Sequence, residues 1–129
     1  AAAFLVRTDA QVIIDGYNVA MLGWPSSNLE SQRRQLLDGV ENLARRFGTS
    51  VTVVFDGAAV VGAHTDRRRL IRVRYSPAGV TADDVIRSEV QRLPASTAVV
   101  VVTNDAEILR DVRAVGVNTL PSNALLAVL

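Results

Sequence analysis

The sequence contains no cysteine and no lysine among its 129 residues, and it has a single histidine. Without cysteine, the chain has no disulfides, no zinc sites of the cysteine type and no cysteine nucleophile. Without lysine, it has no phosphate-binding loop of the Walker type and no Schiff-base chemistry. One histidine excludes multi-histidine metal sites. The groups that remain for chemistry are carboxylates, hydroxyls, amides and the guanidinium groups of fourteen arginines.

Long apolar runs are missing as well. No stretch approaches the roughly 20 apolar residues of a membrane span, so no membrane partner is expected. The apolar start, residues 1–6, lacks a basic leader and is too short for a signal peptide. The hydrophobic fraction of 49% and the charged fraction of 21% are typical of a packed domain. We expect a single cytoplasmic domain over residues 1–129, cut from a longer chain, with a homodimer or flanking domains left open.

Apolar runs of strand length alternate with amphipathic stretches of helix length. Strands are expected at residues 12–14, 51–55, 70–75, 98–102 and 117–120. Helices are expected at residues 29–47, 81–93 and 105–115, with a last one capped by Ser122. The first helix is expected to open with a capping box of Ser27 and Glu30. The segment after the first strand, which contains Tyr17 and Trp24, is expected to form a loop. This order of elements, with near-continuous apolar strands, favours an α/β fold in which helices cover both faces of a parallel sheet.

Acidic residues lie at the ends of four of the expected elements. Asp15 and Asp56 end two strands, Asp83 and Asp84 begin a helix, and Asp105 follows the valine-rich strand. The carboxyl ends of parallel strands meet at one edge, where ligands bind. Clustered carboxylates repel one another unless a cation neutralises them, and their oxygens suit Mg²⁺ or Mn²⁺. Each acid taken singly also fits a helix cap or a turn, so their coincidence at one edge is what predicts a metal site.

Four short motifs occur in a characteristic order. They are Val-Ile-Ile-Asp15-Gly-Tyr-Asn18, Val-Val-Phe-Asp56-Gly, Thr81-Ala-Asp83-Asp84 and Val-Thr103-Asn-Asp105. From residue 12 to residue 124 the chain resembles the NYN domain family, in particular its bacterial YacP-like branch, a relative of the PIN nuclease domains. The resemblance implies a three-layer PIN-like domain with a five-stranded parallel sheet of order 3-2-1-4-5. It also implies a divalent-metal ribonuclease site.

The resemblance implies a role for each motif residue. Asp15, Asp105 and the pair Asp83 and Asp84 would be the catalytic, metal-binding acids. Since adjacent helical residues point about 100° apart, one of that pair is expected to face the metal. The polar residues around the acids would support them: Asn18, Asp56, Thr81, Thr103 and Asn104. Glu107 is expected to turn away from Asp105, because a spacing of two on a helix separates their side chains.

Five arginines fall within residues 67–74. Four of them are candidate RNA-binding residues that would contact phosphates beside the acidic site, namely Arg68, Arg69, Arg72 and Arg74. The same charges would equally suit a solvated edge strand that resists aggregation, and both interpretations stay open. Tyr17 is a candidate for stacking on an unpaired base, whereas Trp24 is expected to cover the core.

Together these features predict a divalent-metal-dependent endoribonuclease. Mg²⁺ or Mn²⁺ held by the acids would bind the scissile phosphate of RNA and activate a water molecule, with no small-molecule cofactor. The alternative is an RNA-binding module that keeps the fold without cleaving. A phosphatase of the haloacid-dehalogenase type is disfavoured because Tyr17 stands where a second aspartate is needed. A response-regulator receiver is disfavoured because the chain has no lysine.

Overall fold

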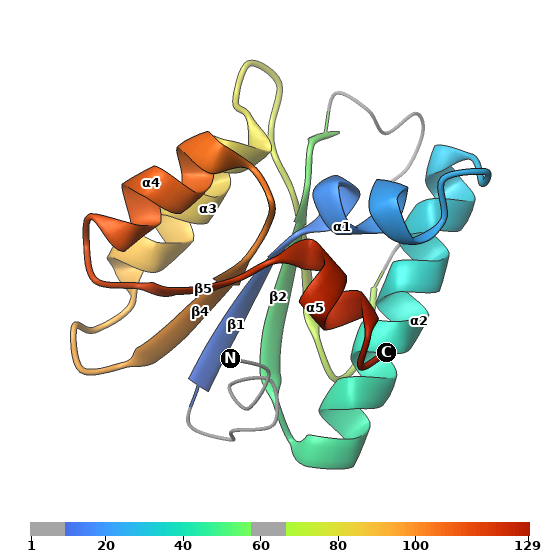
Figure 1. Ribbon diagram of the computed structural model, residues 1–129, viewed down its shortest axis with the longest axis horizontal. Coiled ribbons are helices and arrows are strands. Elements are labelled where there is room, and N and C mark those ends of the chain that lie inside the picture. The colour runs from blue at the N-terminus through green and yellow to red at the C-terminus, as the bar shows by residue number, and fades with distance from the viewer. Residues whose placement is uncertain (1–9, 58–66) are drawn as a thin grey trace.

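A five-stranded parallel sheet forms the centre of the computed structural model, which describes residues 10–57 and 67–129. Its strands are β1 (Ala10–Asp15), β2 (Ser50–Phe55), β3 (Arg72–Tyr75), β4 (Ala98–Val102) and β5 (Asn118–Leu120). They lie in the order β3-β2-β1-β4-β5, and every neighbouring pair is parallel (Figure 1). The order, the parallel pairing and the α/β class are as predicted. β3 and β5 are each shorter at the start than expected.

Helices cover both faces of this sheet. Within the described residues they are α1 (Gly16–Gly23), α2 (Leu29–Phe47), α3 (Ala82–Arg92), α4 (Ala106–Arg113) and α5 (Ser122–Leu126). Buried residues of α1, α2 and α5 share one core with one sheet face, and those of α3 and α4 share a second core with the other face (Figure 1). The three-layer arrangement is therefore confirmed. None of the helices in the described part of the chain is long and apolar enough to cross a membrane.

The valine-rich β4 shows how the strand sequence sets the layers. Val100 and Val102 pack into the first core, and Val99 and Val101 pack into the second, because successive side chains of a strand point to opposite faces. Both faces are covered, so the strand is apolar throughout. Its register pairs Val102 with Ile14 of β1. The next residues of the two strands, Thr103 and Asp15, therefore leave the sheet side by side at its carboxyl edge.

The segment after β1 that contains Tyr17 is a helix, α1, so the expectation of a loop there was wrong. This helix has a glycine at each end, no acid in its first turn and no side-chain cap, so the usual start signals are missing. A Cβ on Gly16 would lie 2.4 Å from Cε1 of Phe55, so only glycine lets α1 begin this close to β2.

Two expected helix caps were also wrong. The N-cap of α2 is Asn28, whose Oδ1 accepts a hydrogen bond from the backbone N of Ser31 at 2.8 Å. Ser27 instead accepts at Oγ from Nε2 of Gln35 at 3.1 Å. The N-cap of α5 is Pro121, which makes Ser122 the first helical residue. Serine and asparagine cap equally well, so sequence alone does not choose between neighbours.

Candidate active site

Asp15 ends β1 at the carboxyl edge of the sheet and is 9% exposed. Its Oδ2 accepts a hydrogen bond from Oγ1 of Thr103 at 2.8 Å. The same Oγ1 accepts from the backbone N of Asp105 at 3.0 Å, and Thr103 is fully buried. One buried hydroxyl thus links the ends of β1 and β4 and fixes Asp15 relative to Asp105.

The carboxyl group of Asp15 carries a charge that its surroundings disfavour. The pKa of Asp15 is raised from 3.8 to about 6, chiefly by burial and against the opposing effect of the hydrogen bond from Thr103. The nearby charges of Asp83 and Asp105 contribute to this increase. Asp15 therefore lies within electrostatic reach of two acids from other elements, as the metal-site hypothesis requires.

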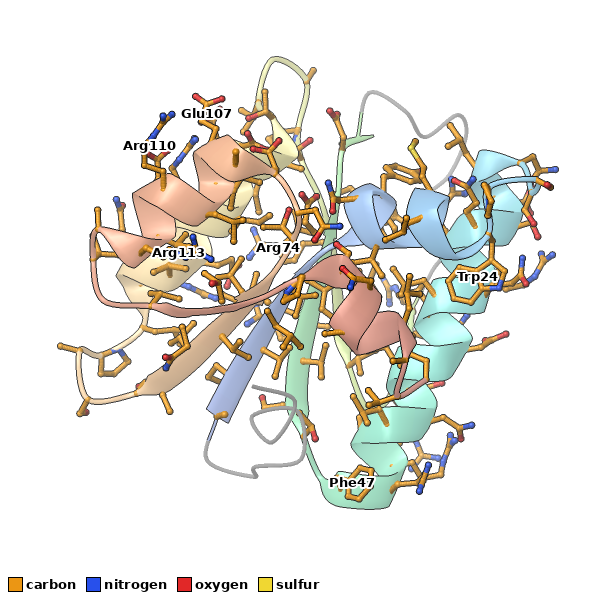
Figure 2. The ribbon with its side chains drawn as sticks, viewed as in Figure 1. Trp24, Phe47, Arg74, Glu107, Arg110 and Arg113 are labelled. Atoms are coloured by element: carbon orange, nitrogen blue, oxygen red, sulfur yellow. The ribbon has the colours of Figure 1, made fainter. Side chains whose placement is uncertain are left out.

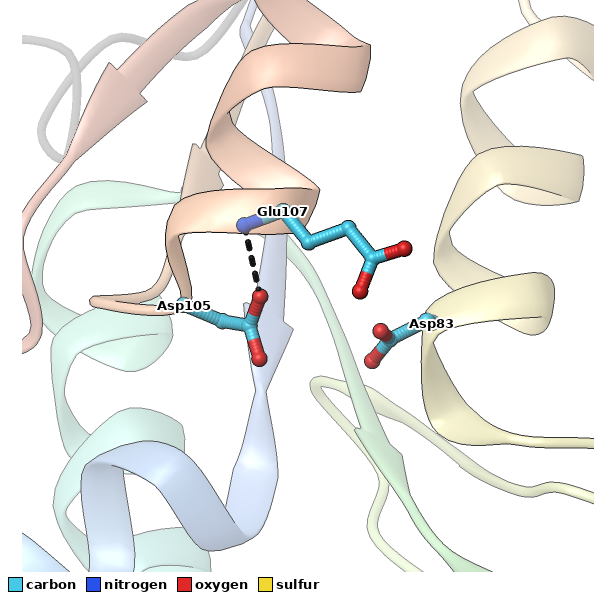
Figure 3. Close-up of side chains that lie close together, drawn as sticks. All are labelled: Asp83, Asp105 and Glu107. Atoms are coloured by element: carbon cyan, nitrogen blue, oxygen red, sulfur yellow. Dashed lines mark hydrogen bonds between the residues drawn. The ribbon is translucent and has the colours of Figure 1, made fainter.

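A second group of acids lies where the first turns of α3 and α4 face each other. Carboxylate oxygens of Asp83, Asp105 and Glu107 lie within 4.8 Å of one another (Figure 3). Burial, and then the charge of Asp105, raises the pKa of Asp83. No arginine in the described part of the chain forms an ion pair with these three acids or with Asp15. We call Asp15, Asp83, Asp105 and Glu107 the acid cluster.

Glu107 belongs to the cluster, and the expectation that it turns away was wrong. Asp105 is the N-cap of α4, with extended backbone angles, and its Oδ1 accepts from the backbone N of Glu107 at 2.9 Å. Because Asp105 precedes the helix, the helical angle between residues two apart does not apply to this pair. In Figure 3 the Glu107 side chain extends from α4 toward Asp83.

Asp83 and Asp84 have different contacts in the structure. Asp84 completes a capping box with Thr81, whose Oγ1 accepts from the backbone N of Asp84 at 3.1 Å. Its carboxylate also accepts from Nη1 of Arg87 at 3.2 Å. Asp84 and Thr81 are thus engaged in starting α3, while Asp83 faces Asp105 and Glu107 across the gap between the helices.

Asn18 and Asn104 take part in a hydrogen-bond network beside the acid cluster, and this network includes Ser122. Oδ1 of Asn18 accepts from the backbone N of Asn104 at 2.9 Å and from Oγ of Ser122 at 2.6 Å. Oδ1 of Asn104 accepts from the backbone N of Ser122 at 2.9 Å. The network ties α1, the β4–α4 connection and α5 together next to Asp15 and Asp105. Ser122 is fully buried. The sequence indicated only a helix cap at this residue and did not predict its hydrogen bond to Asn18.

Asp56 lies on the other side of β1 from α4, at the end of β2. Its Oδ1 accepts from Oγ of Ser76 at 3.4 Å, and that Oγ accepts from the backbone N of Gly57 at 2.9 Å. These bonds join the ends of β2 and β3. Asp56 is not among the residues whose charges raise the pKa of Asp15.

The four candidate RNA-binding arginines have different surroundings. Arg68 pairs with Asp38 at 2.6 Å and Glu41 at 3.5 Å, both on α2. Arg72 and Arg74 project from the same face of β3 toward Glu89 of α3, and Arg69 is exposed (Figure 2 labels Arg74).

The two aromatic candidates differ as well. Tyr17 is 8% exposed, its ring centroid lies 4.9 Å from that of Phe55, and its hydroxyl accepts from Nη1 of Arg33. A ring so enclosed has no open face for a base, so the stacking role expected of Tyr17 does not fit this structure. Trp24, labelled in Figure 2 between α1 and α2, packs against the first core as expected.

A parallel sheet of order 3-2-1-4-5, with helices on both faces and acids at its carboxyl edge, is the architecture of the PIN-like nuclease fold. The chain belongs to the YacP-like NYN domain family, whose model matches residues 12–129. Both the fold and the family are those that the motifs predicted.

Two solved structures that resemble the chain come from Bacillus subtilis. The crystal structure of Rae1 (YacP) from that organism superposes with a TM-score of 0.78 at 23% identity, covering 90% of this chain and 71% of that one. A mutant of the same protein gives a TM-score of 0.75 at 24% identity, covering 92% and 73%. No curated protein matches the chain in sequence.

Proposed function

We propose that this domain is a divalent-metal-dependent endoribonuclease whose active site is the acid cluster. The observation that carries the proposal is the set of four carboxylates, from β1, α3 and the start of α4, that converge with no ion pair among the described residues; Arg87, which pairs with Asp84 and Asp111, offsets only part of the charge around Asp83. Such a cluster is unfavourable for a fold on its own, because every member raises the free energy of its charged neighbours. Membership of the YacP-like NYN family, with its nuclease-like fold, supports a catalytic role for the cluster.

The donor atoms of the cluster fit Mg²⁺ or Mn²⁺, which prefer carboxylate oxygens and water. Asp83, Asp105 and Glu107 would hold the ion, and Asp15 would contribute from the sheet edge. When bound, a divalent ion lowers the pKa of a coordinated water and offsets charge on the scissile phosphate. Hydrolysis by a metal-activated water would need no covalent intermediate, which agrees with the absence of cysteine and lysine.

The residues around the acids have positioning tasks. Thr103 holds the Asp15 carboxylate by donating to Oδ2, which leaves Oδ1 available to a ligand. Asn18 uses its Oδ1 to accept two hydrogen bonds, so its amide nitrogen is directed away from that network and is available as a donor to a phosphate oxygen. Asp84, Thr81 and Asn104 act indirectly, by fixing the helix start and the β4–α4 connection.

The substrate that we assign is RNA, on the basis of the family and of the arginines along β3. Phosphate contacts by arginine give affinity independent of base sequence. An RNA-binding domain without cleavage is the competing function, and it would share the arginines without needing the acids.

Cleavage of single-stranded RNA with Mn²⁺ or Mg²⁺ tests the proposal, with EDTA and Asp15→Asn as controls. We expect turnover that both controls abolish. Binding of Mn²⁺ at ten times its dissociation constant should also stabilise the wild type by about 1.4 kcal/mol, which thermal unfolding detects. An Asp15→Asn/Asp105→Asn double variant should lose that shift. Activity that survives EDTA and Asp15→Asn would refute the proposal, and RNA binding without turnover would support the non-cleaving module.

A further inference from the structure

The helix α3 carries a buried acid that the proposed active site does not use. Glu89 is 5% exposed and contacts three guanidinium groups. Arg74 donates from Nη1 to Oε1, Arg92 donates from Nη2 to Oε2 at 2.7 Å, and Nη2 of Arg72 lies 3.8 Å from Oε1. We call Arg72, Arg74 and Arg92 the arginine cluster. Two of its members come from β3 and one from α3.

The arginine cluster has more positive charge than its acid neutralises. Three guanidinium groups meet one carboxylate, which leaves a net charge of +2 at this point. The side chains of Arg72, Arg74 and Arg92 are 54%, 43% and 58% exposed, whereas that of Glu89 is 6% exposed. Glu89 therefore lies beneath the three cations and holds them at the surface.

The cluster also keeps hydrogen-bond donors for a ligand. A guanidinium group has five N–H donors, and Arg74 and Arg92 each give one hydrogen bond to Glu89. Arginine donors of this kind bind phosphate oxygens in pairs, with a geometry that the planar group sets in advance. Three guanidinium groups fixed by one buried acid are thus arranged for a phosphate-rich ligand.

Two surface hollows meet at the arginine cluster. One, of about 340 Å³, lies between α3 and the segment after β3, and its lining includes Arg74, Arg92 and Asp84. The other, of about 320 Å³, follows the edge strand and is lined by Arg67, Arg68, Ile71, Arg72, Val73 and Arg74. Because Arg74 lines both, arginines extend without interruption from the edge of the sheet to the helix that carries Asp83.

The spacing along α3 relates this surface to the acid cluster. Glu89 follows Asp83 by six residues, which is about 9 Å along a helix axis and about 120° around it, so the two acids lie on different faces of α3. Nucleic-acid phosphates follow one another at intervals of about 3.4 Å along the axis of a duplex strand and farther apart in an extended one, so a few nucleotides cover this distance. The hollow lined by Arg74 and Arg92 also reaches Asp84, next to Asp83 at the start of α3, so a strand that follows it can contact both surfaces at different phosphates.

We propose that the arginine cluster binds the phosphate backbone of single-stranded RNA a few nucleotides from the bond that the acid cluster cleaves, with Glu89 as the residue that positions it. The proposal rests on the proposed function for the identity of the strand, and it adds a second binding surface whose residues Glu89 and Arg92 come from α3. The competing explanation is that Glu89 only stabilises the edge of the sheet.

The test measures RNA affinity on a background that cannot cleave. Asp15→Asn protein carrying Arg72→Gln/Arg92→Gln is compared with Asp15→Asn carrying Arg34→Gln/Arg46→Gln. Both pairs remove two positive charges, and the control pair lies on α2. Arg74 remains to pair with Glu89, which protects the fold. Thermal unfolding checks each variant, and Arg92→Gln alone replaces the cluster variant if that one is unfolded.

For an RNA of about twelve nucleotides, the cluster variant should bind about tenfold more weakly than its parent. The slope of log affinity against log salt should fall by about 1.4, which is two contacts at about 0.7 each for a single strand. The control pair should stay close to the parent. Equal affinity and equal slope in the two variants would overturn the proposal and leave Glu89 a structural role.

A parallel assay separates this proposal from the nuclease itself. In protein that retains Asp15, the Arg72→Gln/Arg92→Gln changes should raise KM for the same RNA while kcat stays near that of the wild type. RNA affinity that depends on the cluster, in a protein that never cleaves, would refute the nuclease and keep this surface. Cleavage by the cluster variant with the KM of the wild type would refute the role of the arginine cluster and keep the nuclease.

Discussion

Two buried carboxylates in the same domain, Asp15 and Glu89, have opposite surroundings. They are 9% and 5% exposed, so burial does not distinguish them. Asp15 has one hydroxyl as its partner and lies among other acids, whereas Glu89 contacts three arginines. A buried acid that is already neutralised contributes to the fold. One that is left uncompensated is available to a cation, and this contrast is what makes the acid cluster the candidate active site.

The largest effect that we expect contrasts two adjacent residues, Asp83 and Asp84. Asp83→Asn should lower RNA cleavage by about 10²–10³-fold, the size typical of removing one electrostatic group from an active site. Asp84→Asn should leave activity within a few-fold and instead cost about 1 kcal/mol of stability, because Asp84 belongs to the capping box. Steady-state kinetics and thermal unfolding measure both quantities. A larger loss of activity at Asp84 would reverse the assignment.

The next prediction applies the same kind of change to both buried acids in metal-free protein at pH 7. Asp15→Asn should stabilise the fold by up to about 3 kcal/mol, since it removes a disfavoured buried charge and keeps an acceptor for Thr103. Glu89→Gln should destabilise it by about 1–3 kcal/mol, because three partly exposed guanidinium groups lose their counter-charge. Denaturant unfolding gives both values. Changes of the same sign would remove the contrast between the two sites.

The free energy of unfolding should depend on pH because burial disfavours the ionised form of Asp15. The pKa of this carboxyl is about 6 in the folded protein and 3.8 ordinarily, so the folded state binds the proton more tightly. The contribution of Asp15 to stability is therefore largest below pH 4 and is lost as pH rises through about 6. The loss amounts to about 3 kcal/mol. In unfolding experiments without metal, wild type and Asp15→Asn should agree near pH 4 and diverge toward pH 7, and a constant difference would contradict this.

Much of the fold could be predicted because strands and long helices leave strong local patterns. The four valines of β4 and the apolar spacing of α2 each identify an element from a few residues. The helix α1 could not be recognised in this way, because its start depends on contact between Gly16 and Phe55, which are distant in sequence. Its exposed residues Met21 and Leu22 are also apolar, so it lacks the polar face that marks most helices.

The candidate site could be predicted only in part, for a similar reason. The acids at the ends of β1 and β4 follow from strand order, since parallel strands present their carboxyl ends at one edge. The position of Glu107 depended on whether Asp105 is a cap or a helical residue, a difference of one residue at a helix boundary. Ser122 and Glu89 act through partners that are distant in sequence, Asn18 and the arginines of β3, and no local pattern relates them.

The smallest effect that we expect concerns a neutral group beside the acids. Ser122→Ala removes the hydroxyl that donates to Oδ1 of Asn18, while the backbone bond of Ser122 to Asn104 remains. Activity should fall about tenfold, the lower end for residues that support metal ligands, and stability should fall by about 1 kcal/mol. Ser96→Ala, at an exposed serine before β4, is the matched control and should change neither. Because Ser122 reaches the acids through Asn18, Ser122→Ala should add little to an Asn18→Ala variant in a double-mutant cycle. Fully additive losses would show that Ser122 acts only on the fold.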